Sequence, residues 1–143
     1  MERYKQFFHS YNAVYRPYVN QLNIVLQEFH LYSSQWRIMH YIWHNGPKNV
    51  SEITQYQKVE KPTTTKMIQR LVALEYLEAT AGEDKRIKVI QLTDKGISVC
   101  QEVQEKIYKF HDYLLKDVSK EEQQIATHVL ETISTRIPGY EIE

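Results

Sequence analysis

The sequence is short of the residues that crosslink a chain or interrupt its regular structure. Among 143 residues it has one cysteine, four glycines and four prolines. A single cysteine excludes an internal disulfide framework and the usual cysteine-rich zinc sites. Few glycines and prolines favour long regular elements. No Ser/His/Asp set, phosphate-binding loop or complete set of metal ligands stands out, so we expect no enzyme, no cofactor and no bound metal.

Long apolar runs are absent too. No stretch approaches the ~18 apolar residues that a membrane-spanning helix needs. The first residues, MERYKQFF, lack the apolar segment of a secretory signal peptide. We therefore expect a cytoplasmic protein without membrane contacts.

Neither sign of charge is in excess, but the charges are unevenly distributed. The chain has 18 basic and 18 acidic residues, so its net charge is zero. Residues 58–70 hold four cations and one anion, a net charge of +3, whereas residues 117–143 hold two cations and six anions, a net charge of −4. A basic middle segment favours an anionic partner such as DNA.

Apolar residues recur three or four positions apart, which is the spacing of a helix buried on one face. The first such stripe consists of Phe7, Tyr11, Tyr15, Tyr18, Leu22, Val25 and Phe29. Pro17 should kink or break this helix near Tyr15. A second helix, capped by Ser33 or Ser34, should end at residues 45–47. Its expected inward residues are Trp36, Met39, Ile42 and Trp43.

The middle of the chain has the layout of a helix-turn-helix. A short helix over residues 51–57 should bury Ile53 and Tyr56. A tight turn over residues 58–60 leads into a longer helix over residues 61–74. That helix should bury Thr64, Met67, Ile68, Leu71 and Leu74. Its outer face of threonine, lysine and arginine suits the major groove of DNA.

A charged turn between two strand-like runs comes next. The runs are residues 77–81 and 87–92, and the turn reads Glu83-Asp84-Lys85-Arg86. A two-stranded tongue with cations at its tip suits the minor groove beside a helix that lies in the major groove. The sequence therefore predicts a mainly α fold, a winged helix-turn-helix with flanking N- and C-terminal dimerisation helices.

Two further helices should follow the wing. Thr93 caps the first, whose apolar stripe is Ile97, Cys100, Val103, Ile107, Phe110 and Leu114. A capping box of Ser119 and Glu122 starts the second, and Pro138-Gly139 stops it. The apolar residues of the second helix are Ile125, Val129, Ile133 and Ile137.

The flanking helices carry more apolar surface than so small a winged helix can cover. We expect a single domain over residues 1–143, with dimerisation helices at about 1–30 and 95–143. The DNA-binding winged helix then covers about residues 31–94. A two-fold homodimer places two such heads on one face, about 34–36 Å apart, which suits double-stranded DNA with a pseudo-palindromic sequence.

These segments resemble the MarR family, the multiple-antibiotic-resistance regulators of bacteria. The resemblance covers nearly the whole chain and rests on short motifs at residues 31–36 (LYSSQW), 61–66 (KPTTTK), 71–77, 84–86 (DKR) and 92–96 (LTDKG). It implies a homodimeric transcription factor on palindromic promoter DNA, often released by a small anionic or phenolic ligand. Family members often have glycine where this chain has Tyr76, so we expect a different or strained turn there.

The resemblance makes Arg86 the residue that enters the minor groove and Asp84 the carboxylate that orients it. The chemistry agrees, because a carboxylate holds a guanidinium by charge-assisted hydrogen bonds. On the helix over residues 61–74, the recognition helix, Thr63, Thr65 and Lys66 lie where base edges are reached. The whole predicted DNA-binding set is Lys61, Pro62, Thr63, Thr65, Lys66, Gln69, Arg70, Asp84, Lys85, Arg86 and Lys88. Whether Ser34, Gln35 and Arg37 also clamp phosphate stays open.

Aromatic residues of the first two helices have two interpretations. Core packing is the commoner role of aromatic side chains at helical spacing. The other is the wall of a pocket for a small aromatic effector, because apolar walls with a few hydroxyls suit an aromatic carboxylate or phenol. The residues concerned are Tyr11, Tyr15, Tyr18, Trp36, His40 and Tyr41.

The remaining reactive residues favour structural roles. His40 and His44 have a spacing that two ligands of one metal can have, but a third ligand is not evident. Cys100 falls on an apolar stripe, which favours a buried thiol over a reactive one. The leading hypothesis is a sequence-specific DNA-binding repressor, and the alternative is a winged-helix module that binds protein and not DNA.

Overall fold

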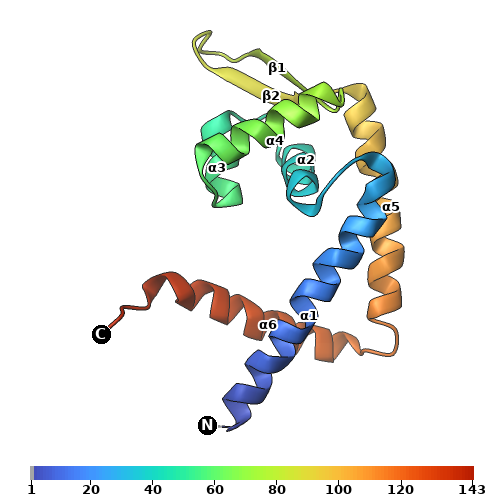
Figure 1. The fold of residues 1–143 in the computed structure, drawn as a ribbon, viewed down its shortest axis with the longest axis vertical. Coiled ribbons are helices and arrows are strands. Elements are labelled where there is room, and N and C mark those ends of the chain that lie inside the picture. Colours follow the sequence, from blue (N-terminus) through green and yellow to red (C-terminus); the bar gives the residue numbers. More distant parts are fainter. Residues whose placement is uncertain (1) are drawn as a thin grey trace. The chain divides into compact units, whose positions relative to one another are not determined.

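The computed structural model describes residues 2–143, and most of them are helical (Figure 1). In chain order the elements are α1 (Glu2–Leu26), the 3-10 helix η1 (Gln27–Phe29), α2 (Ser33–Asn45), α3 (Val50–Gln57), α4 (Lys61–Ala73), β1 (Leu77–Ala81), β2 (Lys88–Leu92), α5 (Asp94–Leu114), α6 (Lys120–Arg136) and the 3-10 helix η2 (Ile137–Gly139). The chain divides into two compact units, one ending at Tyr108 and one covering Lys109–Glu143. The predicted fold class is confirmed, because α3, α4 and the two strands form a winged helix-turn-helix.

The core of the first unit lies where α2, α4, the base of the wing and the end of α1 meet. Its fully buried side chains are Leu26, Ile38, Met39, Ile53, Thr64, Leu71, Leu77, Cys100 and Val103. Trp36, Met39 and Ile42 are buried as expected, but Trp43 is only half-buried and the unanticipated Ile38 is fully buried. Helix α2 buries a wide face because α1, α3, α4 and β2 all pack against it.

The first helix was expected to kink or break at Pro17, near Tyr15-Arg16, and it does not break there. Helix α1 continues from Glu2 to Leu26 with Pro17 inside it. Proline removes one helical hydrogen bond, to the carbonyl four residues earlier. That carbonyl belongs to Ala13, which is exposed, so water can satisfy it.

The predicted serine cap of α2 is also wrong, because Tyr32 occupies the cap position. The Gln35 side chain reaches back and its Oε1 accepts the backbone N–H of Tyr32 at 3.0 Å. Asn23 of α1 accepts the backbone N–H of Ser33 through Oδ1 at 2.8 Å. A side chain of a neighbouring helix therefore satisfies the start of α2, which local sequence signals do not reveal.

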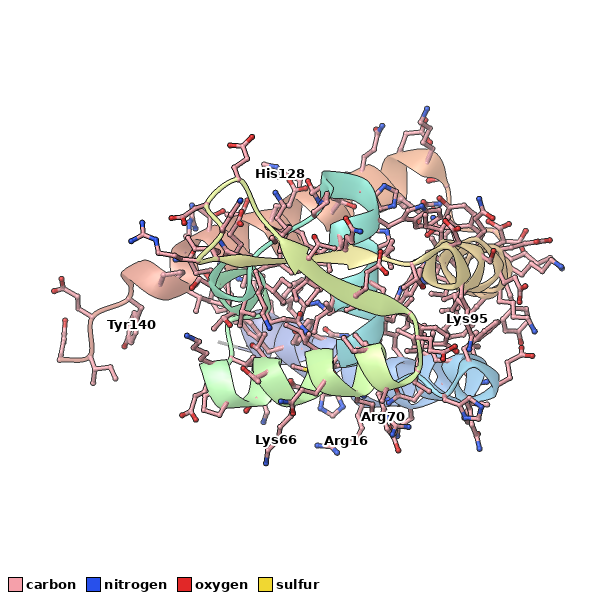
Figure 2. The ribbon with its side chains drawn as sticks, turned by 90° about the horizontal axis from the view of Figure 1, so that it is seen from above. Arg16, Lys66, Arg70, Lys95, His128 and Tyr140 are labelled. Atoms are coloured by element: carbon pink, nitrogen blue, oxygen red, sulfur yellow. The ribbon has the colours of Figure 1, made fainter. Side chains whose placement is uncertain are left out.

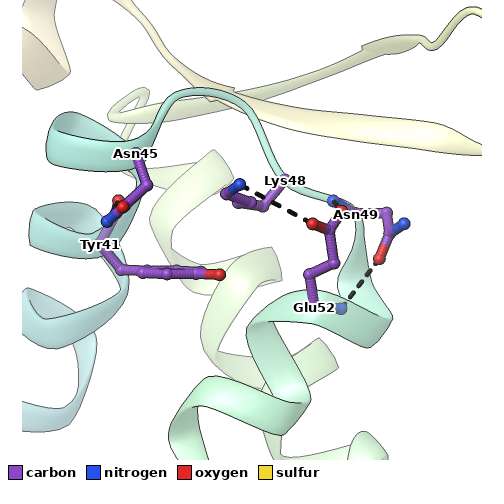
Figure 3. A network of polar contacts seen from close by, with 5 residues as sticks. All are labelled: Tyr41, Asn45, Lys48, Asn49 and Glu52. Atoms are coloured by element: carbon purple, nitrogen blue, oxygen red, sulfur yellow. Dashed lines mark hydrogen bonds and ion pairs between the residues drawn. The ribbon is translucent and has the colours of Figure 1, made fainter.

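Helix α3 begins with a capping box of Asn49 and Glu52 (Figure 3). Asn49 Oδ1 accepts the N–H of Glu52 at 2.9 Å, and Glu52 Oε1 accepts the N–H of Asn49 at 3.1 Å. The expected burial of Tyr56 is wrong, since its side chain is 38% exposed. Gln57 is buried in its place, and its Nε2 donates to the carbonyl of Ser34 at 2.7 Å.

The wing is an antiparallel pair in which Leu77 faces Leu92 and Ala81 faces Lys88. The second strand starts at Lys88, one residue later than predicted. Beyond the buried Leu77, β1 is exposed along its length. On its other side β2 pairs with the loop before α3, where Lys48 and Ile90 exchange backbone hydrogen bonds of 3.0 and 2.8 Å. The backbone pairing of Lys48 with Ile90 therefore attaches the base of the wing to the helices.

In the turn after α4, the residue with the left-handed conformation lies one position earlier than Tyr76, where it was expected. Glu75, and not Tyr76, has the left-handed conformation, with a φ of 64°. The N–H of Glu75 donates to Val72 and that of Tyr76 to Leu71, at 2.9 and 3.0 Å. These two bonds form a Schellman motif, which closes the C-terminus of a helix. The turn is therefore an ordinary one with a non-glycine residue at its left-handed position.

The predicted caps of the last two helices are confirmed. Thr93 Oγ1 accepts the N–H of Gly96 at 2.9 Å at the start of α5. Ser119 and Glu122 form the reciprocal capping box of α6. Among the described residues of α6, none is buried.

Candidate nucleic-acid interface

Helix α4 exposes a polar face on the side away from the core. Thr64, Ile68 and Leu71 are buried because they share one face of the helix. The predicted contact residues Lys61, Pro62, Thr63, Lys66, Gln69 and Arg70 are exposed. Figure 2 shows Lys66 and Arg70 along the same outer side of α4. The arrangement offers cationic and hydroxyl groups to a surface laid against this helix.

Thr65 is the partial exception on this face. Its side chain is half-buried, and its hydroxyl donates to the carbonyl of Lys61 at 3.0 Å. The hydroxyl proton is therefore engaged within the helix. What Thr65 can offer a base is an acceptor lone pair and a methyl group.

The wing tip holds an oriented guanidinium. Asp84 Oδ1 accepts the backbone N–H of Arg86 at 3.1 Å and its Nε–H at 3.2 Å, and Oδ2 accepts from Nη2 at 3.2 Å. The guanidinium and then the backbone N–H of Arg86 lower the pKa of Asp84. The Arg86 side chain nevertheless remains 90% exposed. The pairing expected between these two residues is present, and Lys85 and Lys88 are exposed beside it.

A column of aromatic rings and cations joins α2 to α3. The rings of Tyr41 and Tyr56 stack with centroids 4.0 Å apart. Arg37 lies over the Tyr56 ring at 5.4 Å, and Lys48 lies over the Tyr41 ring at 5.8 Å and 3.8 Å from Glu52 Oε2 (Figure 3). The sequence did not indicate the contacts of Lys48, because its partners lie on α2, α3 and β2.

Two of the three residues left open as a phosphate clamp have roles inside the protein. Gln35 is buried and caps α2, and Arg37 lies over Tyr56. Ser34 accepts the Gln57 amide through its carbonyl, while its side chain is exposed. These contacts favour a structural role for Gln35.

Ring contacts join two pairs among the six residues of the predicted effector pocket. Tyr11 and Tyr15 are exposed and stack on each other at 6.5 Å. Trp36 and His40 lie 5.5 Å apart, and Tyr41 stacks on Tyr56. Tyr18 is half-buried, and burial raises its pKa. The structure therefore joins Trp36 to His40 but pairs Tyr41 with a residue outside the predicted set.

A groove of about 310 Å³ lies near the recognition helix. It is lined by Asn23, Ile24, Gln27, His30, Leu31, Tyr32 and Arg70. Arg70 is the one predicted DNA-binding residue among them. No sequence signal indicates this groove, because it forms where the α1–α2 connection meets the outer face of α4.

His40 and His44 contact each other on α2, and Cys100 is buried in α5. The rings of His40 and His44 are 4.2 Å apart, and burial and then the neighbouring His44 lower the pKa of His40. Within residues 2–143, no group of three or more His, Cys, Asp or Glu residues is placed to hold a metal ion. Cys100 is buried, as interpreted from the sequence, and burial raises its pKa to about 12. None of the helices described is long and apolar enough to cross a bilayer.

Comparison with known proteins agrees with this geometry. The MarR family model matches residues 31–88. The uncharacterized HTH-type transcriptional regulator YwoH of Bacillus subtilis is 34% identical over 125 residues, which cover 87% of this chain and 91% of that protein. The structure of Staphylococcus aureus MarR in complex with salicylate and kanamycin is 26% identical, covers 98% of this chain and 95% of that one, and has a TM-score of 0.87.

A mutant of Escherichia coli MarR, solved in complex with operator DNA, shares the fold. Its TM-score is 0.79 at 20% identity, over 90% of this chain and 93% of that one. The close relative, the family match and the winged helix all lead to one assignment. The chain belongs to the MarR family of DNA-binding winged helix-turn-helix transcriptional regulators, which are not enzymes.

Proposed function

We propose that the protein is a repressor that binds pseudo-palindromic promoter DNA as a homodimer. The exposed, oriented Arg86 beside the polar face of α4 carries this proposal. Helix α4 enters the major groove and Arg86 the adjacent minor groove, where negative potential is focused. The contact residues are Lys61, Pro62, Thr63, Thr65, Lys66, Gln69, Arg70, Asp84, Lys85, Arg86 and Lys88. Its site of action is the cytoplasm, where bacterial DNA lies.

Exposed apolar side chains support the homodimer. The first half of α1 exposes Tyr4, Phe7, Phe8, Tyr11, Val14 and Tyr15. Helix α6 exposes Ile125 and Leu130. Patches of this kind are usual at interfaces and rare on isolated surfaces. We assign residues 1–30 and 95–143 to the dimer and residues 31–94 to DNA binding, within one functional domain.

We further propose that a small aromatic anion releases the DNA. The Staphylococcus aureus MarR of similar fold was solved with salicylate. In this chain the groove beside α4 is lined by Arg70, His30 and Tyr32. A carboxylate bound there competes with phosphate for Arg70. The aromatic set Tyr11, Tyr15, Tyr18, Trp36, His40 and Tyr41 is the second proposed site.

Salicylate serves as the probe and should weaken DNA binding. If the groove is the site, Arg70→Gln should reduce that effect.

Selection of bound sequences from a random DNA pool tests the central proposal. We expect a palindrome whose half-sites are about one helical turn apart. Affinity for the selected DNA should fall steeply with salt, because each neutralised phosphate adds ~0.9 to the log–log slope. Recovery of no preferred sequence, together with weak and salt-insensitive binding, would favour the alternative, a protein-interaction module.

A further inference from the structure

One residue, Tyr76, joins the recognition helix and the wing to two other segments. Its N–H donates to Leu71 of α4 at 3.0 Å, and its carbonyl accepts the N–H of Thr93 at 3.1 Å. Its hydroxyl donates to the carbonyl of Phe29 in η1 at 2.8 Å. The residue is only 5% exposed. The end of α4 and the start of the wing therefore meet two segments that are distant in sequence, η1 and the start of α5, at a single residue.

The surroundings leave Tyr76 little room to move. A Cβ added to Gly96 would lie 2.1 Å from the Tyr76 carbonyl oxygen, so glycine is required for the close approach of α5. Thr93 Oγ1 donates to the Glu75 carbonyl at 2.6 Å. Lys95 Nζ lies 5.6 Å from the centre of the Tyr76 ring. The start of α5 is thereby fastened to the turn between α4 and the wing.

The wing needs such an anchor at its base. The hydrogen bonds between Arg86 and Asp84 stay within the tip, so they orient the guanidinium but do not aim the tip. Strand β1 is exposed after Leu77, so beyond that residue it is held by its pairing with β2 and not by burial against the helices. On the β2 side the anchor is the backbone pairing of Lys48 with Ile90. On the β1 side it is the Tyr76 hydroxyl.

We propose that Tyr76 is a positioning residue for DNA binding. Its hydroxyl, held on the Phe29 carbonyl, fixes the direction in which the wing leaves α4, and so places Arg86 relative to the recognition helix. The inference rests on the proposed DNA-binding function. It assigns to Tyr76 a part in affinity although Tyr76 itself is buried and touches no DNA.

A double-mutant cycle of Tyr76→Phe and Arg86→Ala tests the proposal. Operator affinity is measured by fluorescence anisotropy on the selected DNA, at a salt concentration where all four proteins bind. In the parent protein, Tyr76→Phe should lower operator affinity about 3- to 10-fold, the effect of one lost hydrogen bond. In the Arg86→Ala background it should lower affinity less than about 2-fold, because there is no longer an arginine to aim. Binding to random DNA should change less than about 2-fold.

Independent sites this far apart normally have additive effects, within about 2-fold in affinity. From its first residue to its last, β1 alone spans about 13 Å at the usual rise per residue. Equal losses in the two backgrounds would therefore identify a general loss of stability and overturn the proposal. Unchanged affinity of Tyr76→Phe would overturn it too. Failure of the parent protein to bind any DNA would instead contradict the proposed function.

Two further variants complete the design. Tyr113→Phe removes the hydroxyl of a tyrosine that is 78% exposed, and should leave operator affinity unchanged. If Tyr76→Phe does not fold, Thr93→Val is taken through the same cycle, because it removes the hydroxyl bond to Glu75 at the same turn, together with the cap of α5. An additive result with Thr93→Val counts against the proposal, and a non-additive one supports it.

Discussion

At the scale of single residues, the carboxylate of Asp84 orients the guanidinium of Arg86 at the wing tip. Asp84 engages only part of the Arg86 donor set, and a guanidinium has five N–H groups. The side chain is 90% exposed, so its remaining donors are open to solvent, while Asp84 restricts its orientation. Because Arg86 lowers the pKa of Asp84, the carboxylate stays ionised to a lower pH than an ordinary aspartate. The orientation of Arg86 should therefore not change across neutral pH.

Arg86→Ala should weaken operator binding by about 1–3 kcal/mol, because a contact in the minor groove is lost. Lys85→Ala is the matched variant, since Lys85 is the exposed neighbour at the same tip. It should weaken operator and random DNA about equally and lower the salt slope by ~0.9. Anisotropy titrations at several salt concentrations measure both. Unchanged operator affinity of Arg86→Ala, with the dimer intact, would contradict the wing assignment.

Cys100 should be inert towards thiol reagents in the folded protein. Its pKa is raised to about 12 by burial, so at pH 8 it is a neutral, inaccessible thiol. Labelling by iodoacetamide at pH 8 should proceed only as denaturant unfolds the chain. Because the unfolded thiol ionises near pH ~8.5, this group lowers stability progressively as pH rises from there towards about 12. Rapid labelling without denaturant would show that Cys100 is open to reagents.

At the scale of elements, the turn after α4 places a residue with a side chain where glycine is preferred. Glu75 has a φ of 64°, which is disfavoured for residues with a Cβ. Its carboxylate lies 3.8 Å from Lys95, but both side chains are largely exposed, so the pair contributes little. The helix end is therefore held by backbone hydrogen bonds and by the anchored Tyr76, at some local conformational cost.

A comparison of Glu75→Gly with Glu75→Ala should measure the conformational cost of the left-handed backbone apart from the ion pair, since both variants lose the Lys95 contact. Glycine adopts the left-handed conformation without strain, so Glu75→Gly should be more stable than Glu75→Ala by about 1 kcal/mol. Urea unfolding monitored by circular dichroism gives the difference. Equal stability of the two variants would mean that the left-handed backbone at this position is not a significant cost.

The sequence revealed those elements whose signals are local. Thr93, and Ser119 with Glu122, cap their helices within four residues, and the apolar spacing of α4 places Thr64 and Leu71 inside. Contacts between distant residues were not predictable from such signals. The Tyr76 hydroxyl bonds a residue 47 positions away, and Gln57 bonds one 23 positions away. The groove beside α4 was missed for the same reason, whereas the roles of the DNA-contact residues stay predictions.

At the scale of the whole molecule, both ends of the chain expose apolar side chains that a monomer has no reason to keep. Phe7, Phe8 and Tyr11 in α1 are exposed, and so is Ile125 in α6. Fully burying one such side chain contributes roughly 1.5–3 kcal/mol. A second copy that covers these residues would therefore contribute to the stability of each chain, as in obligate dimers.

The full chain should sediment with twice its mass of 17.1 kDa. Tyr11→Glu, which places a charge at a side chain that is 48% exposed, should shift the protein towards monomer and weaken operator binding. Asn12→Glu adds the same charge one position along the same helix, at an exposed polar residue, and should leave the dimer intact. Analytical ultracentrifugation of the parent protein and both variants measures the oligomeric state. A monomeric parent protein would contradict the homodimer.

Because the wing is exposed, a small rotation at its base displaces its tip by a larger distance than its base. Its first strand is held at Leu77 and is exposed beyond it as far as Ala81, a distance of about 13 Å. A rotation of about 10° at the base moves the far end of such a strand by about 2 Å, which is enough to break a hydrogen bond. If the wing contacts DNA as proposed, a small rearrangement at the Tyr76 turn should therefore be enlarged at the wing tip.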